Sequence, residues 1–361
     1  MRPANVVAAS VLAGVVVLGG VAAARQPGVL TDQRGKTFTF AEPAKRVVTI
    51  AIPLFWTFLA VDGNERRVVG ANAVATAQMR DGIVSRVFPR AGTVPTDITR
   101  GGTFTPNIEA LLALQTDAVF QWADRGDELI NALDRAGLRA IGVKNTSSES
   151  DSESWIRMSG VVAGKSARAD SIVQWMRTGN QRFDALTASI PTAERPRVLV
   201  LVEYSRAIRI DGPTSYSTPM LRRAGGVNAA TNDGNISLEQ ALSWNPDVIL
   251  LSAFEAKRPA DLIADPRWGS TKAAKAGRVY KLPFGVTRWG GYGPESPLFL
   301  AWLTSVLHPR RFDIRFREEA RAAYRTLYHH ELADTELDTM LQVEENGASA
   351  AYVQFAGRAA R

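Results

Sequence analysis

The segment VTRWGGYGPESPLFLAWL, residues 286–303, places a guanidinium, an indole and a phenol among three glycines, just before an apolar helical pattern. Guanidinium groups bind anions and aromatic rings cover flat ligand faces, so Arg288, Trp289 and Tyr292 form a predicted clamp for an anionic ligand. The glycines allow close backbone approach. No Gly-Lys-Ser/Thr sequence follows them, which excludes a Walker-type phosphate loop. The alternative interpretation is a packed loop with Trp289 in the core.

Further aromatic and basic side chains stand where apolar, strand-like runs end. They are Phe55 and Trp56 after RVVTIAI, Trp122 in TDAVFQW, and Tyr204 and Arg206 after RVLVLVE. Parallel α/β sheets bind ligands beyond the carboxyl ends of their strands, so these residues join the predicted binding set. We expect one of Phe55 and Trp56 to face the cleft while the other packs beneath it. Tyr204 and Arg206 are equally compatible with a hairpin surface. Arg125 and Arg209 are further candidates for ligand contact, for which the alternative is an ordinary exposed arginine.

Catalytic and metal-binding signatures are missing from the sequence. It contains no G-x-S-x-G, no H-E-x-x-H and no cysteine. Its histidines, His308, His329 and His330, all fall in the final helical region, away from the predicted strand ends. We therefore expect a protein that is not an enzyme, with no cofactor and no site for a bare transition metal.

Two sets of apolar runs alternate with short helical patterns. The first set contains RVVTIAI, RRVVGAN, TDAVFQW and LRAIGV, with helical NIEALLAL and DELINALDRAG between them. The second contains RVLVLVEY, PDVILLSAF and GRVYKLPF, with helical TPMLRRAGG and SLEQALSW. Strands that are apolar throughout and separated by helices are typical of parallel sheets covered on both faces, so the predicted class is α/β.

A long helix is predicted between the two sets. In KSARADSIVQWMRTGNQRFDALTAS the apolar residues fall on one helical stripe, which indicates a helix over residues 167–189 that crosses from one lobe to the other. The alternative is a surface helix of the first lobe. The predicted division is a signal peptide (1–24), an N-terminal α/β lobe (25–164), an interlobe helix (165–190), a C-terminal α/β lobe (191–332) and a tail (333–361) that is first helical and then frayed.

The amino terminus has the pattern of a secretory signal peptide. Arg2 precedes an apolar run over residues 6–21, and three alanines then supply a cleavage site. The alternative is an uncleaved membrane anchor. Because the chain has no cysteine, we exclude a lipoprotein anchor and disulfides. We therefore expect an exported, periplasmic protein that buried cores stabilise without disulfides.

Length and charge narrow the class of protein further. The 361 residues exceed what one hydrophobic core usually serves, which favours two lobes. The net charge of +7 is scattered, with no run of five basic residues, so we do not expect nucleic acid as a partner. A small anionic ligand and a solvated basic surface both remain compatible with this charge.

An ordered series of phrases resembles a known family. It runs TDQRGKTFTFAEPAKRVVTIAIP, PNIEALLALQTDAVF, a lone helix, TPMLRRAGGVNAA, ISLEQALSWNPDVILLS and DPRWGSTKAAKAGRVYKLP. Over residues 30–330 the chain resembles class III periplasmic substrate-binding proteins of ABC importers, in the ferric-siderophore and vitamin B12 branch. The resemblance implies two α/β lobes on a rigid helix, a ligand between them, and a monomer that delivers it to an ABC permease and its ATPase at the inner membrane.

The resemblance also suggests docking residues and a cargo. Glu109 and Glu239 occupy equivalent places in the two lobes, where the family pairs glutamates with permease arginines; the alternative is a carboxylate that favours a helix N-terminus. A metal chelate, with a ferric siderophore favoured, suits arginines combined with aromatic rings. A corrinoid, haem, a nickel chelate and a small oxyanion stay open. An exported interaction scaffold without small-molecule cargo is the alternative from another class.

Overall fold

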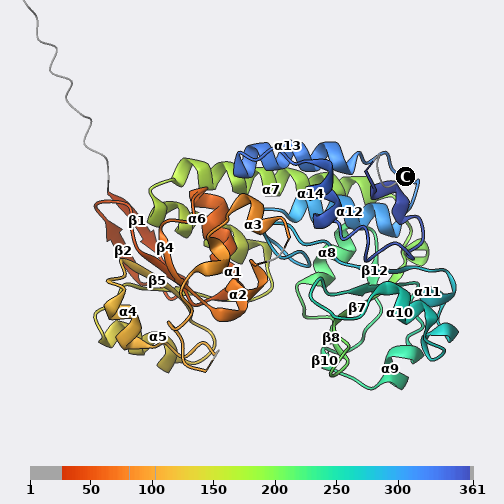
Figure 1. Ribbon diagram of the computed structural model, residues 1–361, viewed down its shortest axis with the longest axis horizontal. Helices are drawn as coiled ribbons and strands as arrows, with labels where there is room; N and C mark the ends of the chain where they lie inside the picture. Colours follow the sequence, from red (N-terminus) through yellow and green to blue (C-terminus); the bar gives the residue numbers. More distant parts are fainter. Residues whose placement is uncertain (1–26, 81, 102, 358–361) are drawn as a thin grey trace, which may run out of the picture.

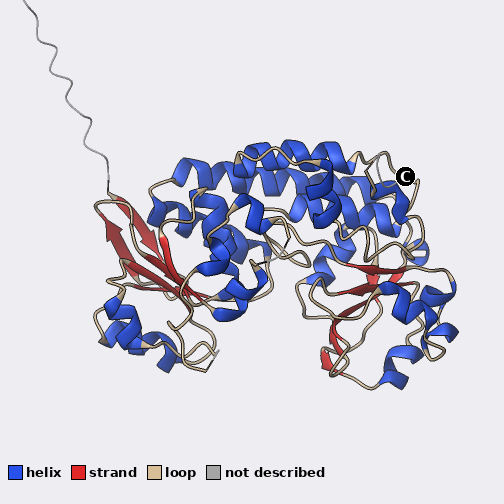
Figure 2. Cartoon of the chain, in the orientation of Figure 1, coloured by secondary structure: helices blue, strands red, loops and turns tan. Residues whose placement is uncertain are grey.

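The computed structural model describes residues 27–80, 82–101 and 103–357. The predicted signal peptide, residues 1–24, lies outside this part of the chain. The described residues form two lobes side by side, spanned along one edge by long helices (Figure 1). Each lobe combines a β-sheet with helices (Figure 2). The predicted α/β class, with two lobes and a connecting helix, is confirmed.

The N lobe, the described residues before helix α7 (Ser166–Thr187), contains a parallel sheet in the order β4-β3-β5-β6. Its strands are β3 (Val47–Thr49), β4 (Val68–Ala71), β5 (Ala118–Trp122) and β6 (Ala140–Val143). Every residue of β3, β5 and β6 is buried, which is why these strands are apolar throughout. An unpredicted antiparallel hairpin, β1 (Gly28–Thr31) and β2 (Thr37–Phe40), is tied to β6 by the Gln33 amide, which donates to the Gly142 carbonyl.

The C lobe, which follows α7, contains a mixed sheet. Its strands are β7 (Arg197–Glu203), β8 (Arg209–Asp211), β9 (Val227–Asn228), β10 (Gly234–Asn235), β11 (Val248–Leu251) and β12 (Val279–Lys281). The predicted apolar runs form the parallel strands β7, β11 and β12. An antiparallel edge of β8 and β10 was not predicted, because the short segments RID and GN carry no strand pattern.

Short helices connect the strands, and longer ones run along the shared edge of the lobes (Figure 1). The N lobe contains α1 (Ile52–Asp62), α2 (Ala73–Gln78), α3 (Val84–Val87), the 3-10 turn η1 (Ala91–Thr93), α4 (Ile108–Ala113), α5 (Asp127–Arg135) and α6 (Glu149–Ala163). The C lobe contains η2 (Thr192–Glu194), α8 (Ser217–Arg223), α9 (Leu238–Ser243), α10 (Pro259–Ala264), η3 (Trp268–Ser270), α11 (Lys272–Lys275), α12 (Ser296–Leu307), α13 (Phe316–Tyr328), α14 (Asp334–Met340) and η4 (Tyr352–Phe355).

Helix α7 has 22 residues and packs against elements of both lobes. The Trp175 indole N–H donates to the Pro294 carbonyl at 3.0 Å, at the start of α12. Gly179 makes this packing possible, because a Cβ there would lie 2.5 Å from the Pro297 ring. One hydrophobic cluster runs from α1 through α7 to α12, so the lobes share a core along this edge.

The tail after α14 differs from the frayed segment that we predicted. Tyr352 and Phe355 are buried, and the Trp302 indole N–H donates to the Tyr352 hydroxyl at 3.0 Å. Asn346, also buried, pairs with strand β12 by accepting from the Lys281 amide and donating to its carbonyl. These few anchors hold the tail against the C lobe as far as Gly357. The other residues of the tail are mostly small, so the sequence shows no pattern that predicts the anchors.

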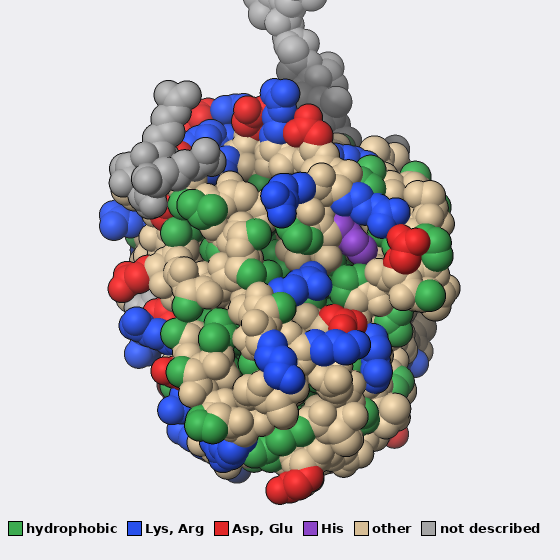
Figure 3. Space-filling model, turned by 90° about the vertical axis from the view of Figure 1, so that its right-hand side faces the viewer, with side chains coloured by type: hydrophobic (Ala, Val, Ile, Leu, Met, Phe, Trp, Pro, Cys, Tyr) green, Lys and Arg blue, Asp and Glu red, His purple; other side chains and the backbone are tan. Residues whose placement is uncertain are grey.

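No described helix is long and apolar enough to cross a bilayer. Figure 3 shows one end of the molecule, where basic side chains are spread among acidic ones without a continuous basic stripe. This distribution on the visible face matches the scattered charge of the sequence.

Candidate functional site

A pocket lies between the two lobes, beyond the carboxyl ends of β4, β11 and β12. Its volume is about 790 Å³. The N lobe contributes Val74, Ala77, Gln78 and Gly82; the C lobe contributes Ala253, Phe254 and Phe284, with tail residues between 338 and 345. A pocket of this size, at strand ends and between lobes, is where α/β proteins bind small molecules.

Arg288 lies beside this pocket without lining it, next to the C-lobe residue Phe254, which does. Its guanidinium carbon lies 5.9 Å from the centre of the Phe254 ring, and the side chain is exposed to solvent. Surrounding protein desolvates the group and lowers its pKa, while the Asp211 carboxylate acts in the opposite direction. Since arginine stays protonated in proteins, the site carries a fixed positive charge. Within the described residues, no carboxylate forms an ion pair with Arg288.

A buried carboxylate holds the loop that carries Arg288. Glu295 is fully buried and accepts from the Val286 amide (3.1 Å), the Thr287 amide (3.2 Å) and the Trp289 indole N–H (2.8 Å). Burial raises the pKa of Glu295, and these donors oppose the rise. The loop conformation is therefore fixed by hydrogen bonds to one side chain inside the protein.

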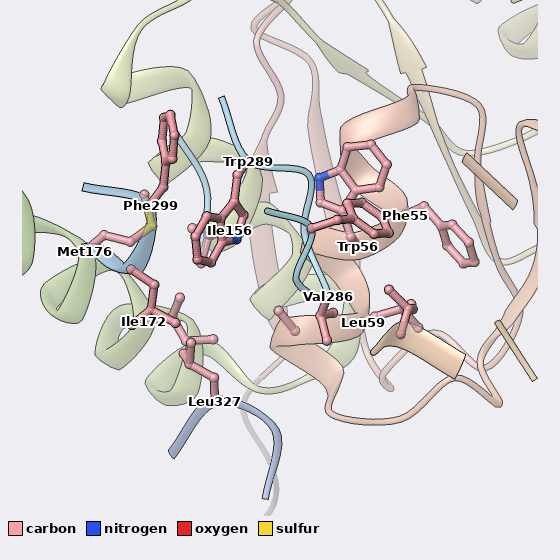
Figure 4. Packing of buried hydrophobic residues seen from close by; sticks show 14 of the residues in the cluster. Phe55, Trp56, Leu59, Ile156, Ile172, Met176, Val286, Trp289, Phe299 and Leu327 are labelled. Carbon is pink, nitrogen blue, oxygen red and sulfur yellow. The ribbon is translucent and has the colours of Figure 1, made fainter. Parts of the chain in front are cut away.

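The same bonds correct the prediction for Trp289. Its side chain is 3% exposed, and its ring packs 6.1 Å from the centres of both the Phe299 and Phe316 rings. Figure 4 shows Trp289 within the buried cluster near Phe299. Because the Trp289 indole N–H donates to the buried Glu295 carboxylate, the ring lies in the core, where it supports the loop instead of covering a ligand.

Phe55 and Trp56 also lie in the core, which differs from the expectation that one of them faces the cleft. Both belong to helix α1, and their exposed fractions are 0% and 7%. Figure 4 shows both rings among other buried side chains. Helix α1 starts directly after β3 and is buried along almost its whole length, so it offers no exposed face for a ligand at these positions.

Arg125 is the counterpart of Arg288 on the N lobe. Its guanidinium carbon lies 4.7 Å from the centre of the Trp122 ring and 4.8 Å from that of Phe104. Trp122 itself is 1% exposed, and its indole N–H has no hydrogen-bond partner among the described residues. Trp122 thus forms the support beneath the exposed guanidinium of Arg125, which was itself a candidate from the sequence.

Tyr216 faces the N lobe from the C lobe, and sequence reasoning missed it. Its hydroxyl is buried and has no hydrogen-bond partner among the described residues. Burial raises the pKa of its phenol, and the charges of Asp151, Arg125 and Asp124 in the N lobe also act on it. Gly291 lets the ring approach the Arg288 loop, because a Cβ there would lie 2.9 Å from Tyr216. The phenol therefore stays protonated as a free donor.

Three other predicted residues lie at the edges of this arrangement. The Tyr204 hydroxyl accepts from the Trp268 indole N–H at 3.0 Å and from Arg267 at 3.3 Å, which ties it to the C lobe itself. Arg206 is exposed in the turn between β7 and β8. Tyr292 is half-buried, with the Arg223 guanidinium 5.7 Å from its ring centre.

Glu109 and Glu239 are both exposed in the first turns of short helices, α4 and α9. These helices lie on different lobes, and both are far from the edge that α7 follows (Figure 1). The Glu239 carboxylate also accepts hydrogen bonds from its own amide and the Ser237 hydroxyl, which lower its pKa. Both carboxylates are thus presented to the solvent at the start of a helix, one on each lobe.

Metal-binding groups do not gather anywhere in the described part of the chain, where no three His, Cys, Asp or Glu side chains are placed to hold an ion. His308 is buried, and its Nε2 lies 3.2 Å from the Gly225 carbonyl. His330 pairs with Glu336 at 3.1 Å. The pocket lining itself carries the Phe254 and Phe284 rings and the carboxylates of Asp338, Glu344 and Glu345, while the Arg288 guanidinium lies beside it, next to Phe254.

Comparison with known proteins finds the same architecture. A family model described as periplasmic binding protein matches residues 58–285. The chain is 24% identical to the molybdate-binding protein MolA of Haemophilus influenzae, over 83% of this chain and 92% of the relative. It is 25% identical to the Fe(3+)-citrate-binding protein YfmC of Bacillus subtilis, over 72% and 80%.

Solved structures extend this comparison. A periplasmic solute binding protein from Veillonella parvula superposes with a TM-score of 0.80 at 28% identity, over 89% of this chain and 99% of that one. MolA bound to molybdate superposes with a TM-score of 0.73 at 21% identity, over 84% and 99%. At 21% identity, the similarity to MolA is a similarity of fold alone.

Proposed function

The chain belongs to the periplasmic binding proteins of ABC importers, and on that premise we propose that it captures an anionic metal chelate between its lobes. A ferric siderophore is the favoured cargo. The protein leaves the ligand chemically unchanged, in keeping with a family of substrate-binding proteins. We place it in the periplasm, as an exported monomer without a resident cofactor.

One observation carries this proposal: each lobe holds a guanidinium that has aromatic support and, within the described residues, no ion-pair partner. Arg125 stacks on Trp122 and Phe104, and Arg288 lies over Phe254. Charge-assisted hydrogen bonds to an anion are about twice as strong as neutral ones. An anion bound by both groups would bridge the lobes, and the free phenol of Tyr216 would add a donor between them.

Bridging gives the protein its mechanism. A ligand that contacts both lobes binds the closed form more tightly than the open form, and so shifts the population toward closure. The shared core along α7 restricts this closure to a small movement of one lobe toward the other. Release follows when permease contact favours the open form again.

Pocket size favours a bulky chelate over a small ion. The volume of about 790 Å³ lies within the range of roughly 300–1,000 Å³ that is usual for drug-sized ligands. A tetrahedral oxyanion would fill only a small part of it. A small oxyanion is still the second candidate, because one relative is named for molybdate. Corrinoids, haem and nickel chelates are further alternatives in the same transport class.

We also propose that Glu109 and Glu239 dock the loaded protein on an ABC permease that works with its ATPase. Both carboxylates are exposed, one on each lobe, at the ends of the lobes that lie away from α7 (Figure 1). Their separation from the cleft residues leaves the ligand covered while the permease binds.

The test is a titration of the mature protein with ferric siderophores, ferric citrate, corrinoids, haem and molybdate, followed by tryptophan fluorescence. Because Trp122 lies directly beneath Arg125, a bound coloured chelate should quench the emission at micromolar concentration or below. Competition with a colourless anion that restores the emission distinguishes binding at a specific site from absorption of light by the chelate. Folded protein that responds to none of these ligands would contradict the transport function and favour an interaction scaffold.

A further inference from the structure

An ion pair joins the two lobes directly, beside the helix that they share. Glu149 is the first residue of α6 in the N lobe, and Arg223 is the last residue of α8 in the C lobe. The Arg223 Nη2 donates to the Glu149 Oε2 at 2.7 Å. All other ion pairs of the described residues lie within one lobe or between one lobe and α7. This contact therefore links the lobes without a ligand.

Helix α7 contacts both members of this pair. The Asn180 Nδ2 donates to the Glu149 Oε1 at 2.6 Å. One turn further along α7, the Asp184 Oδ2 lies 3.1 Å from the Arg223 Nη1. Asn180 is fully buried, where an amide is costly unless it is bonded on both sides. Its Oδ1 accepts from the Ser296 hydroxyl at 3.2 Å, at the start of α12 in the C lobe. A single turn of α7 thus connects polar groups of both lobes.

The surroundings make this pair stronger than an ordinary surface contact. The Glu149 and Arg223 side chains are 25% and 16% exposed, so much of their water is displaced, which raises the attraction between the charges. Fully exposed pairs contribute little. The Arg223 guanidinium also lies 5.7 Å from the centre of the Tyr292 ring, which holds it from a third side. Removal of Arg223 would leave the half-buried charge of Glu149 with Asn180 as its remaining donor.

Helix α8 turns one face toward the N lobe at both of its ends. Tyr216, directly before the helix, has helical backbone angles and lies seven residues before Arg223, so the two side chains fall on the same face. At this end the charge of Asp151 in the N lobe reaches the buried phenol of Tyr216. The ion pair therefore belongs to an interface between the lobes that follows the length of α8.

We propose that Glu149 and Arg223 are positioning residues, which form a latch that sets the angle between the lobes before any ligand binds. Figure 1 shows α6 and α8 on the side of α7 that faces the free ends of the lobes, so a contact between them opposes opening. A ligand then meets walls that are already near their bound positions, which raises its apparent affinity in proportion to the population of that form. Neither residue is among those that line the pocket, so the latch acts whichever ligand the cleft takes.

The test measures the distance between the lobes in ligand-free protein. Because the chain has no cysteine, Ala113→Cys on α4 and Ser243→Cys on α9 provide two unique sites for spin labels, both exposed and one on each lobe. Double electron–electron resonance should give a narrow distance distribution in this background. Arg223→Gln should broaden the distribution and shift it to longer distances. Arg222→Gln removes the neighbouring exposed arginine and is the matched control, which should leave the distribution unchanged.

Further variants distinguish the pair from its separate members. Glu149→Gln should produce the same shift as Arg223→Gln, and the double variant should shift no further, because either change breaks the same contact. Arg223→Lys keeps the charge but cannot bond Glu149 and Asp184 through a planar fork, so it should give an intermediate distribution. Circular dichroism of each labelled variant shows that it is folded.

Three results would overturn the latch. Folded Arg223→Gln and Arg223→Lys with the distribution of the control would show that the pair does not set the lobe angle. An equal shift in Arg222→Gln would assign the effect to net charge. Shifts that add in the double variant would mean that Glu149 and Arg223 act separately. Because no ligand is present, each of these results leaves the transport function standing, and failure of the chelate titration leaves the latch standing.

Discussion

The two walls of the cleft present the same chemical group by different means. Arg125 lies three residues beyond β5 and rests on Trp122 and Phe104, both fixed in the N lobe. Arg288 lies in a longer loop beyond β12, and that loop depends on hydrogen bonds to the buried Glu295. The comparison teaches that one guanidinium is positioned by packing beneath it, whereas the other is positioned by a carboxylate behind it.

Glu295→Ala should have the largest effect, on the free energy of unfolding, because it removes the buried acceptor that holds the Arg288 loop. The change leaves the Thr287 amide, the Thr287 hydroxyl and the Trp289 indole N–H without their buried acceptor, whereas the Val286 amide keeps the Tyr324 hydroxyl as an acceptor. At about 1–3 kcal/mol for each unpaired group, we expect the free energy of unfolding to fall by roughly 3 kcal/mol or more. Urea denaturation followed by circular dichroism measures it.

The control for this change is Glu194→Ala, which removes an exposed carboxylate that pairs with Arg311 on the surface. Its unfolding free energy should change by less than about 1 kcal/mol. If both variants lose the same small amount, Glu295 does not hold the loop and the contrast between the walls disappears.

Arg288→Ala tests the wall that a loop provides. Loss of a charged hydrogen bond to an anionic ligand should weaken binding by roughly 1.5–3 kcal/mol. Fluorescence titration with the best-binding chelate measures the loss. Arg66→Ala, at an exposed position, is the matched control and should bind normally. An affinity of Arg288→Ala equal to that of the control would remove this residue from the site.

Arg125→Ala tests the opposite wall and should cost less, about 1–2 kcal/mol of binding free energy, since part of the interaction energy of its guanidinium is its contact with the Trp122 and Phe104 rings. The double variant sharpens the comparison. If both groups hold one anion, the two losses should not add, and the titration will show a coupling energy. Strict additivity would mean that the arginines contact separate parts of the ligand.

Glu109→Ala together with Glu239→Ala should have the smallest effect on affinity, because both carboxylates lie outside the cleft on exposed helix starts. Chelate binding by the purified protein should be unchanged, while chelate-dependent uptake by cells should fall. Each single variant shows whether the two lobes contribute equally. Weakened binding in the double variant would show that the docking assignment is wrong.

Sequence reasoning predicted the architecture better than the binding surface. Apolar runs specify parallel buried strands, so the class and the long helix followed from pattern alone. The buried position of the Trp289 side chain depends on Glu295, six residues further on, whose carboxylate accepts a hydrogen bond from the indole N–H. A glutamate placed directly before a mainly apolar helical pattern was the one available signal.

The pocket residues were harder to foresee, because they come from three distant segments. Phe254 follows β11 within a predicted strand end, yet only the fold shows that it faces Val74 of the other lobe. The contribution of Val343 depends on how the tail is anchored by Gln342. The position of Tyr216 depends on its close packing against Gly291 in a distant segment of the chain, which the spacing of residues in the sequence does not reveal.

Helix α7 has a consequence for how the membrane partner senses loading. Its 22 residues span about 33 Å at 1.5 Å per residue, and its buried face packs against both lobes, so it fixes the separation of the lobes along this edge. Glu109 and Glu239 lie at the ends of the lobes away from this helix, so the proposed closure would change the span between them. In the proposed docking, the permease would detect cargo as a change in the tilt of one lobe against the other. A small rotation near the cargo produces a larger displacement at Glu109 and Glu239, because they lie far from the edge that α7 follows.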